Sequence, residues 1–342
     1  MTTEPVNKTV MEITRDGTIT LDQMIMMLSL QYDQKTIQKA VAEFCLQTND
    51  SLTINKGMEY LYMNGCYKEL EILVKKVRKT LLNSRTMRAE IYQLMIDRKL
   101  NRAKPLEILN HVYSLQTNET EIKCLIEFLK ISIHYDTRNF GKLGNFLNLQ
   151  DRLLAEIKDS YLLSFFNIRL YEILFTYYWV NNELLIARKY AFQVLNLTKN
   201  PKTKVSIHIN LALTYTFDTF HQGMYHLMEA TKISEEHGFH EKINMIKNHN
   251  LPFLAARHGK ADGISSSDIS EQAHLEIARG NLKKAEQLLR TLPINTPFQM
   301  YYLGLATSDK KLLHQSYNFF IKKRSDYFFS RLPLLAIQKI NG

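Results

Sequence analysis

The residues that could support catalysis or metal binding are scattered through the sequence. Eleven histidines occur, and His237 and His240 stand close together in HGFH, but no cysteine or acidic residue is placed to complete a metal site with them. The segment DGISSSD lacks the terminal glutamate of a calcium-binding loop. The sequence contains no glycine-rich phosphate loop and no GxSxG or HExxH motif. We therefore predict a protein that is not an enzyme and that uses no metal and no cofactor.

Several charged residues stand at the starts of predicted helices, where helix capping or solvation accounts for them. Asp268 and Glu271 have the spacing of a capping box, in which the glutamate reaches back to a backbone N–H. Asp326 immediately precedes an apolar helix and has the position of an N-cap. Lys202 follows Pro201 at a helix start, where its side chain would be solvated.

Positive charge is concentrated between residues 75 and 104. The formal net charge of the chain is +10 at pH 7, and this stretch holds ten lysines or arginines against Glu90 and Asp97. One interpretation is a surface that binds nucleic acid, and the other is an ordinary solvated helix face. The residues we expect to contact DNA under the first interpretation are Lys75, Lys76, Arg78 and Lys79.

The elements that must position these residues are helical hairpins, most clearly over residues 266–341. Leu275, Ala278, Leu282, Ala285, Leu288 and Leu289 recur at helical spacing. Gly280-Asn281 interrupts that pattern, since glycine can take the left-handed conformation that ends a helix. A similar turn is predicted at Ser308-Asp309. Successive hairpins with small residues near their turns are typical of tetratricopeptide-like repeats.

The same pattern extends toward the N-terminus. We predict hairpin turns at Asn64-Gly65, near 137–139 and at Asn181-Asn182, and a long internal loop at 258–268. Residues 21–47 read as two helices with a break near Tyr32-Asp33. This pair faintly resembles a DNA-binding helix-turn-helix, and two ordinary repeat helices are the alternative. The polar residues on the second helix of that pair are Thr36, Gln38 and Lys39.

Cysteine usage and the N-terminal segment indicate the cellular compartment. The three cysteines are widely spaced and form no CxxC motif, which argues against a disulfide framework. The start, MTTEPVNKT, has no apolar signal-peptide core. The most apolar stretch, LYEILFTYYWV, is too short to span a bilayer and contains Glu172. We therefore predict a soluble protein of the cytoplasm.

The order and spacing of the C-terminal third carry a family resemblance. EQAHLEIARGNLKKAEQLL followed by FQMYYLGLATSDKKLLHQSYNFFIKKRSDYFFSRLPLLAIQKING is similar to the AimR family of arbitrium peptide receptors of temperate Bacillus phages. That family is related to the Rap and RRNPP peptide-pheromone receptors. Weaker similarity comes from YLLSFFNIRLYEIL, from INLALTYTF and from DGTIT near the start.

The resemblance implies a peptide ligand and a set of binding residues. In that family, a tetratricopeptide-like superhelix encloses a short secreted peptide that contains an arginine and ends in a free carboxylate. Two acids clamp the arginine, and a basic residue at a helix start takes the carboxylate. The matching positions here are Glu271, Asp326 and Lys202.

Other positions depart from the family pattern. The relatives line their groove with asparagines where this sequence has Thr176, Val180 and Leu213, and Asn210 lies one turn from Leu213 and could substitute. We therefore expect Thr176 and Asn210 to contact the peptide and the peptide sequence to differ. The relatives begin with a complete DNA-reading motif and end with an additional helix that supports dimerisation. This chain has at most a remnant of the former and stops at Gly342, so DNA binding and a homodimer are the less expected states.

Together these observations predict an all-α fold, a right-handed superhelix of degenerate tetratricopeptide-like helical hairpins. We expect a remnant helix-turn-helix region at 1–50, the superhelix at 51–262 and hairpins closing the peptide groove at 263–342. The predicted function is that of a phage-encoded intracellular receptor for a short communication peptide. It would regulate the lysis–lysogeny decision as a peptide-controlled transcriptional regulator. The alternative is a peptide-gated, Rap-like protein-binding module without DNA contact.

Overall fold

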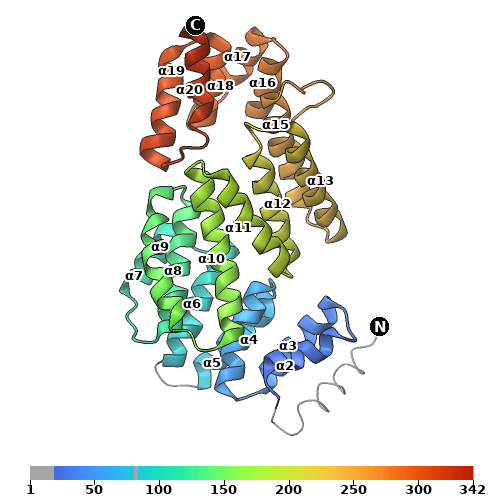
Figure 1. Cartoon of the computed structure of the whole chain (residues 1–342), viewed down its shortest axis with the longest axis vertical. Helices are drawn as coiled ribbons and strands as arrows, with labels where there is room; N and C mark the ends of the chain where they lie inside the picture. Colours follow the sequence, from blue (N-terminus) through green and yellow to red (C-terminus); the bar gives the residue numbers. More distant parts are fainter. Residues whose placement is uncertain (1–18, 81–83, 342) are drawn as a thin grey trace. The chain divides into compact units, whose positions relative to one another are not determined.

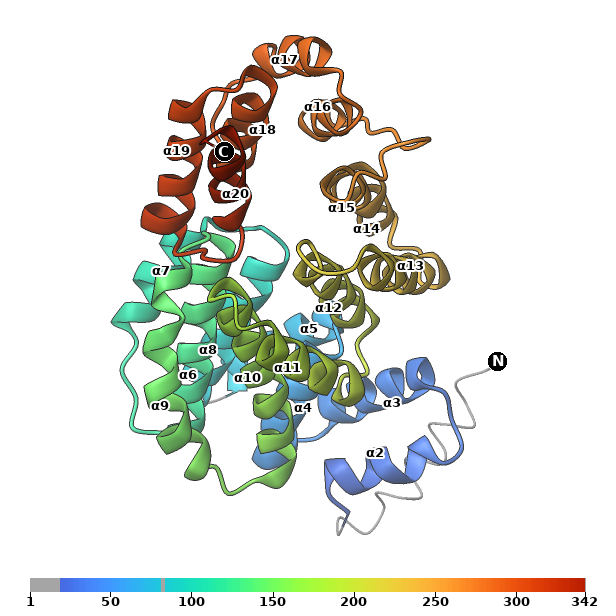
Figure 2. The ribbon, with the colours of Figure 1, turned by 45° about the horizontal axis from the view of Figure 1, so that its top comes forward.

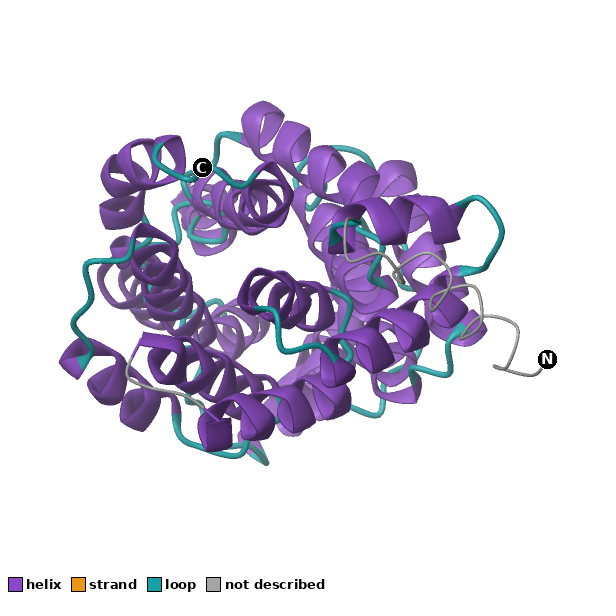
Figure 3. Cartoon of the chain, turned by 90° about the horizontal axis from the view of Figure 1, so that it is seen from below, coloured by secondary structure: helices purple, strands orange, loops and turns teal. Residues whose placement is uncertain are grey.

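The computed structural model describes residues 19–80 and 84–341 of the chain. These residues form helices joined by loops, with no strand among them (Figure 3). The chain divides into two compact units, each described here by itself. The first comprises Met1–Thr137 and Asn145–Leu170, and the second comprises Arg138–Gly144 and Tyr171–Gly342. The predicted boundaries at 50 and 262 separate regions by function. The division into compact units does not test them, so they stay a prediction. Residues 1–18, which include most of DGTIT and part of the predicted remnant motif, lie outside the described residues.

The first unit consists of helices that pack as successive hairpins (Figure 1). The side chains of Thr20, Asp33 and Asp50 each accept a hydrogen bond from a first-turn N–H group, which fixes where three helices begin. The break near Tyr32-Asp33 is confirmed. The helices are α2 (Leu21–Ser29), α3 (Gln34–Gln47), α4 (Ser51–Met63), α5 (Tyr67–Thr80), α6 (Ser84–Lys99), α7 (Pro105–Ser114), α8 (Thr120–Asp136), α9 (Gly144–Ala155) and the first half of α10 (Ser160–Val180).

A buried ion pair joins distant helices of this unit. Arg169 on α10 donates to both carboxylate oxygens of Glu59 on α4, at 2.8 and 2.9 Å. The Tyr92 hydroxyl of α6 donates to the same carboxylate. Both charged residues are inaccessible or nearly so, and the guanidinium lies 4.4 Å from the ring centre of Tyr62. Because removing one member would leave the other charge buried and unpaired, this network fixes how the three helices meet.

The second unit continues the hairpin pattern through the C-terminus (Figures 1 and 2). Pro201 and Pro297 occupy the first positions of two of its helices, where proline favours helix initiation. Its elements are η1 (Phe140–Lys142), the end of α10, α11 (Leu184–Leu197), α12 (Pro201–Thr214), α13 (Phe220–Glu236), α14 (His240–Met245), η2 (Ile246–Asn250), α15 (Leu251–Arg257), α16 (Ile269–Ala278), α17 (Leu282–Arg290), α18 (Pro297–Thr307), α19 (Lys310–Asn318), η3 (Phe319–Arg324) and α20 (Arg331–Asn341).

Turn residues stand where the sequence predicts them. Asn182, Gly280 and Ser308 have φ angles of 65°, 83° and 54°, and Gly65 and Arg138 have the same left-handed conformation. The predicted long loop at 258–268 separates α15 from α16. Sequential helices pair as hairpins on either side of these turns. The predicted all-α, tetratricopeptide-like class of fold is therefore confirmed.

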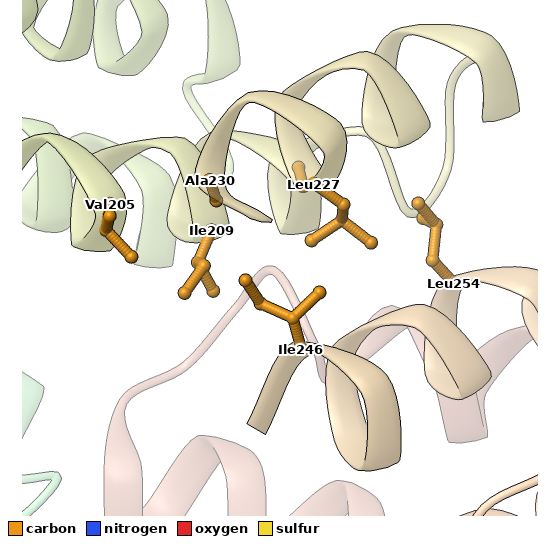
Figure 4. Close-up of a cluster of buried hydrophobic side chains, with 7 residues drawn as sticks. Val205, Ile209, Leu227, Ala230, Ile246 and Leu254 are labelled. Carbon is orange, nitrogen blue, oxygen red and sulfur yellow. The ribbon is translucent and has the colours of Figure 1, made fainter. Parts of the chain in front are cut away.

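One core of the second unit lies where α12, α13 and the α14–η2–α15 segment meet. Its buried side chains come from all three segments, as Figure 4 shows. The close contact of α12 with α13 requires Gly223, since a Cβ there would lie 2.6 Å from Leu254 and 3.2 Å from the Ala212 carbonyl. The members of this cluster are Val205, Ile209, Ala212, Leu227, Ala230, Ile246 and Leu254.

Candidate functional site

Glu271 on α16 presents a carboxylate with one unused oxygen. Asp268 caps the helix by accepting the Glu271 N–H at 2.9 Å, as the capping interpretation predicts. The reciprocal bond does not form, because the Asp268 N–H donates to the Ser266 hydroxyl. Instead, Oε1 of Glu271 accepts the Tyr302 hydroxyl at 3.0 Å, and the buried Oε2 has no hydrogen-bond partner among the described residues. The glutamate is therefore more than a helix cap.

His274, one turn further along α16, adds a second unpaired polar atom. Its ring stacks on Tyr302 with centroids 4.2 Å apart, and the residue is 3% exposed. Its Nδ1 lies 3.7 Å from Oε2 of Glu271, and it too lacks a hydrogen bond to any described residue. Leaving buried polar atoms unsatisfied is unfavourable by about 1–3 kcal/mol each. The pair is thus a place where a ligand donor would be stabilised.

Asp326 lies at the other acidic position of the predicted site. It follows η3 and Ser325, whose left-handed conformation turns the chain. Its Oδ1 accepts the Phe329 N–H at 2.9 Å, so the capping interpretation holds for this oxygen. The residue is 4% exposed. Burial raises the pKa of the carboxyl to about 6, although the Phe329 N–H and the guanidinium groups of Arg324 and Arg138 oppose the increase.

An aromatic cluster connects the two acidic positions. Phe253 on α15 contacts His274 at 5.7 Å between centroids and Phe329 at 5.8 Å. Trp179, near the end of α10, contacts Phe328 and Phe329, and its indole Nε1 is buried without a partner among the described residues. The aromatic rings therefore form a continuous path from α10 and the turn before α20 to α16.

Backbone hydrogen bonds fix the same meeting of distant segments. The Val180 carbonyl accepts the N–H groups of Tyr327 and Phe328 at 2.8 and 3.1 Å. Asn182 also accepts Nη1 of Arg331 at 3.0 Å. The C-terminal hairpins are thus held directly against the end of α10 within this unit.

The remaining predicted contact residues lie at different distances from this cluster. Thr176 is buried on α10 one turn before Val180, and its hydroxyl donates to the Glu172 carbonyl. Lys202 is exposed at the N-terminal end of α12, and its Nζ lies 5.5 Å from the ring centre of Phe239. Asn210 is half-buried on α12 and has contacts of its own. No described contact links Lys202 to Glu271 or Asp326.

The sequence interpretation missed Tyr302 and His274 as part of the site. Both fit the helical pattern of ordinary core residues, so periodicity cannot distinguish them. The signal that could have found Tyr302 is the density of aromatic residues around 298–302, next to a glutamate-bearing helix. Their contact nevertheless depends on how α16 packs on α18.

The predicted DNA-contacting residues lie on α5 of the first unit. Lys75, Arg78 and Lys79 are exposed. Lys76 instead donates to the carbonyls of Leu46 and Thr48 at 2.9 and 2.5 Å, and so satisfies the C-terminal end of α3.

Acidic partners reduce the charge excess of the basic stretch. Arg88, Arg98 and Arg102 form ion pairs with Glu121, Asp136 and Glu71, which all lie outside residues 75–104. On α3, Lys39 is exposed while Thr36 and Gln38 are half-buried. The free cationic surface is therefore smaller than the sequence indicates.

Metal clusters and membrane-spanning helices are not features of the described part of the chain. Over residues 19–80 and 84–341, no set of three or more histidine, cysteine or acidic side chains is arranged to hold a metal ion. In the same residues, no helix is both long and apolar enough to cross a membrane. The features that do stand out are hairpins and an acidic, aromatic cluster, which define a helical-repeat protein with chemistry suited to binding.

The chain belongs to the family described as AimR transcriptional regulator-like, which matches residues 37–339. The AimR transcriptional regulator of Bacillus phage SPbeta is 23% identical over 316 residues, covering 87% of this chain and 79% of that protein. An uncharacterized Bacillus anthracis protein is 26% identical over 225 residues, covering 62% of this chain and 83% of its own. The predicted family is thus confirmed.

Solved structures share the fold. The structure of phAimR with its ligand matches with a TM-score of 0.79 at 16% identity, covering 94% of this chain and 98% of that one. The selenomethionine form of phAimR matches with a TM-score of 0.69, also at 16% identity, covering 94% and 86% of the two chains. At this identity the likeness establishes the fold.

Proposed function

We propose that this protein is a phage-encoded intracellular receptor for a short secreted peptide and that it regulates the lysis–lysogeny decision as a peptide-controlled transcriptional regulator. Membership of the AimR transcriptional regulator-like family supports this proposal. So does the fold shared with phAimR, which has been solved with a ligand. The receptor would act in the host bacterial cytosol, where it meets peptide that has been taken up.

The observation that carries the proposal is the unused carboxylate oxygen of Glu271. Tyr302 fixes one oxygen of this carboxylate and leaves the other without a donor in a buried site. An arginine of the peptide would supply that donor, and Asp326 would supply a second carboxylate from the far side of the aromatic cluster. Charge-assisted hydrogen bonds of this kind contribute about 1.5–3 kcal/mol each.

Peptide titration tests the proposal. The probes are synthetic hexapeptides with a free C-terminal carboxylate, taken from the short reading frame directly downstream of the gene. We expect one of them to bind, to raise the melting temperature and to change the emission of Trp179, which contacts Phe328 and Phe329. Glu271→Gln and Asp326→Asn should each weaken binding by about 1.5–3 kcal/mol in calorimetry.

The matched control is Glu286→Gln, which removes an acid from α17, where Glu286 pairs with the exposed Arg290. Its peptide affinity should be unchanged. If Glu271→Gln and Asp326→Asn keep full affinity and lose only melting temperature, both acids have purely structural roles and the proposal fails.

A second function, a peptide-gated protein-binding module without DNA contact, is favoured by the basic stretch. Lys76 is occupied by carbonyls of α3, and three arginines are neutralised by acids. Fewer cations are therefore left for phosphate than the sequence of this stretch indicates. A gel shift on the phage's own regulatory DNA across a range of salt concentrations separates the two functions, because phosphate contacts weaken steeply with salt.

A further inference from the structure

Two arginines flank one aromatic ring at the edge of the aromatic cluster. Phe217 lies in the loop after α12, and its ring is within cation–π distance of two guanidinium groups. Arg257, at the end of α15, has its guanidinium carbon 5.1 Å from the ring centre, and Arg331, at the start of α20, has its own 4.1 Å away. Segments far apart in the sequence thus bring two positive charges to one place.

Neither arginine has a counter-charge among the described residues. Arg257 makes no ion pair with any of them, and its Nε is buried without a hydrogen-bond partner. Within the same part of the chain, Arg331 donates only to the neutral side chain of Asn182. By contrast, Arg188, which stacks on Tyr215 in a similar way, is satisfied by Thr214 and Asp218. Arg188 thus has hydrogen bonds and an ion pair in addition to its cation–π contact, and Arg257 has neither among the described residues.

The acidic side chains near these two arginines already have cationic neighbours. Asp218, next to Phe217 in the chain, pairs with Arg188, and the guanidinium groups of Arg324 and Arg138 are the cations that act on Asp326. A buried guanidinium nitrogen without an acceptor, such as Nε of Arg257, is unfavourable. The planar fork of a guanidinium matches a carboxylate with two parallel hydrogen bonds. The two guanidinium groups beside Phe217 thus lack an anionic acceptor. A carboxylate has the two oxygens that such an acceptor needs.

The arginines border the same aromatic cluster as the acids. Phe217 contacts Phe328 at 5.1 Å, and Phe328 contacts Phe329 at 4.9 Å. Phe329 in turn contacts Phe253, which contacts His274 beside Glu271. A ligand with charges of both signs could therefore lie across the cluster with its cation at Glu271 and its anion at Phe217.

We propose that Arg257 and Arg331 bind a carboxylate of the ligand. The source is either the C-terminus or an aspartate or glutamate side chain. The peptide nature of this ligand rests on the proposed function, and the pairing of two arginines with a carboxylate does not. This site is distinct from Lys202, which lies at the start of α12, whereas Phe217 follows the end of that helix. The helix rises by about 18 Å between Lys202 and Thr214 at 1.5 Å per residue.

A small carboxylate tests the anion site without any peptide. The probe is sodium acetate, compared with sodium chloride at equal ionic strength and with acetamide. Acetate should raise the melting temperature of the unmodified protein at millimolar concentration, and Arg257→Gln or Arg331→Gln should each remove at least half of that shift. Arg290→Gln removes one charge from the exposed end of α17 and should keep the full shift. An absent shift, or the same shift in all four proteins, overturns the site.

Peptides then distinguish the two sources of the carboxylate. The probe is a pooled library of hexapeptides with one arginine, made with free or amidated C-termini and with or without aspartate and glutamate. Arg257→Gln should lower its affinity about tenfold or more, and Arg257→Lys should recover part of it. If amidation of the C-terminus lowers the affinity, the bound carboxylate is the C-terminus. If omission of aspartate and glutamate lowers the affinity, the bound carboxylate is a side chain.

The outcomes separate this proposal from the proposed function. If Glu271→Gln lowers the affinity for the peptide library and Arg257→Gln does not, the proposed anion site is wrong and the proposed peptide-receptor function stands. If acetate binding depends on both arginines but no peptide binds, the anion site stands and the receptor function fails.

Discussion

At the scale of single residues, the buried carboxyl of Asp326 links ligand binding to pH. Burial raises its pKa to about 6. Because a ligand cation requires the ionised form, we expect peptide affinity to fall as pH decreases below about 6, by up to tenfold per unit. Calorimetry between pH 7.5 and 5 measures this slope. Asp326→Asn should bind weakly with a flatter pH profile, and an identical slope in both proteins would exclude Asp326 as the origin.

The same pKa shift acts on folding with the opposite sign. An unfolded aspartate ionises near pH 3.8, and the folded one holds its proton up to about pH 6. Between these values the folded state binds more protons than the unfolded state, so this residue's contribution to stability increases as pH decreases from 6 toward 4. Ionised Asp326 therefore lowers the stability of the folded state, and a bound cation would offset that loss.

The hydroxyl of Tyr302 positions the Glu271 carboxylate. Tyr302→Phe keeps the ring stacked on His274 but removes the donor to Oε1, so the buried carboxylate loses its hydrogen bond. We expect the free energy of unfolding to decrease by about 1–3 kcal/mol, measured by urea denaturation. Tyr301→Phe is the matched control, because no hydrogen bond from that hydroxyl to a described residue is present. Equal losses in both variants would show that the Tyr302 bond contributes nothing specific.

At the scale of elements, α18 and α19 approach so closely that only glycine fits at position 304. A Cβ there would lie 2.8 Å from a methyl group of Leu313, 2.9 Å from its Cγ and 3.3 Å from the Asp309 carbonyl. Alanine increases helix propensity by up to about 1 kcal/mol, but overpacking costs about 1–3 kcal/mol. We therefore expect Gly304→Ala to destabilise the protein in urea unfolding.

The control for this substitution is Lys311→Ala on the exposed face of α19, which should change stability by less than about 0.5 kcal/mol. A more stable Gly304→Ala protein would mean that Leu313 moves away freely. The contact between the two helices would then be looser than the distances indicate.

At the scale of the whole molecule, DNA binding should depend on the exposed cations of α5. Combined replacement of Lys75, Arg78 and Lys79 by alanine should weaken binding to every duplex tested. The slope of log affinity against log salt should decrease by about 0.9 for each phosphate that the variant no longer neutralises. Lys76→Ala should mainly lower stability, because its ammonium caps α3. If the unmodified protein binds no duplex at low salt, the protein-binding module becomes the better account.

The sequence by itself determined the hairpins and the positions of their turns. Asn182, Gly280 and Ser308 adopt the left-handed conformation where the helical pattern breaks. Ala187, Ala191 and Ala285 are fully buried, as small packing residues should be. These features depend on residues within a few positions of one another, and local backbone preferences act over that range.

Only the tertiary structure decided which charges are left without partners. Tyr302 reaches Glu271 across 31 residues, and Arg331 reaches Asn182 across 149. The sequence predicts that Lys76 is a phosphate contact, and the packing of α3 on α5 gives its ammonium two carbonyls instead. A side chain's role depends on which partners the fold places beside it. Those partners lie on helices that are far away in the sequence, and the local sequence of neither helix specifies the contact.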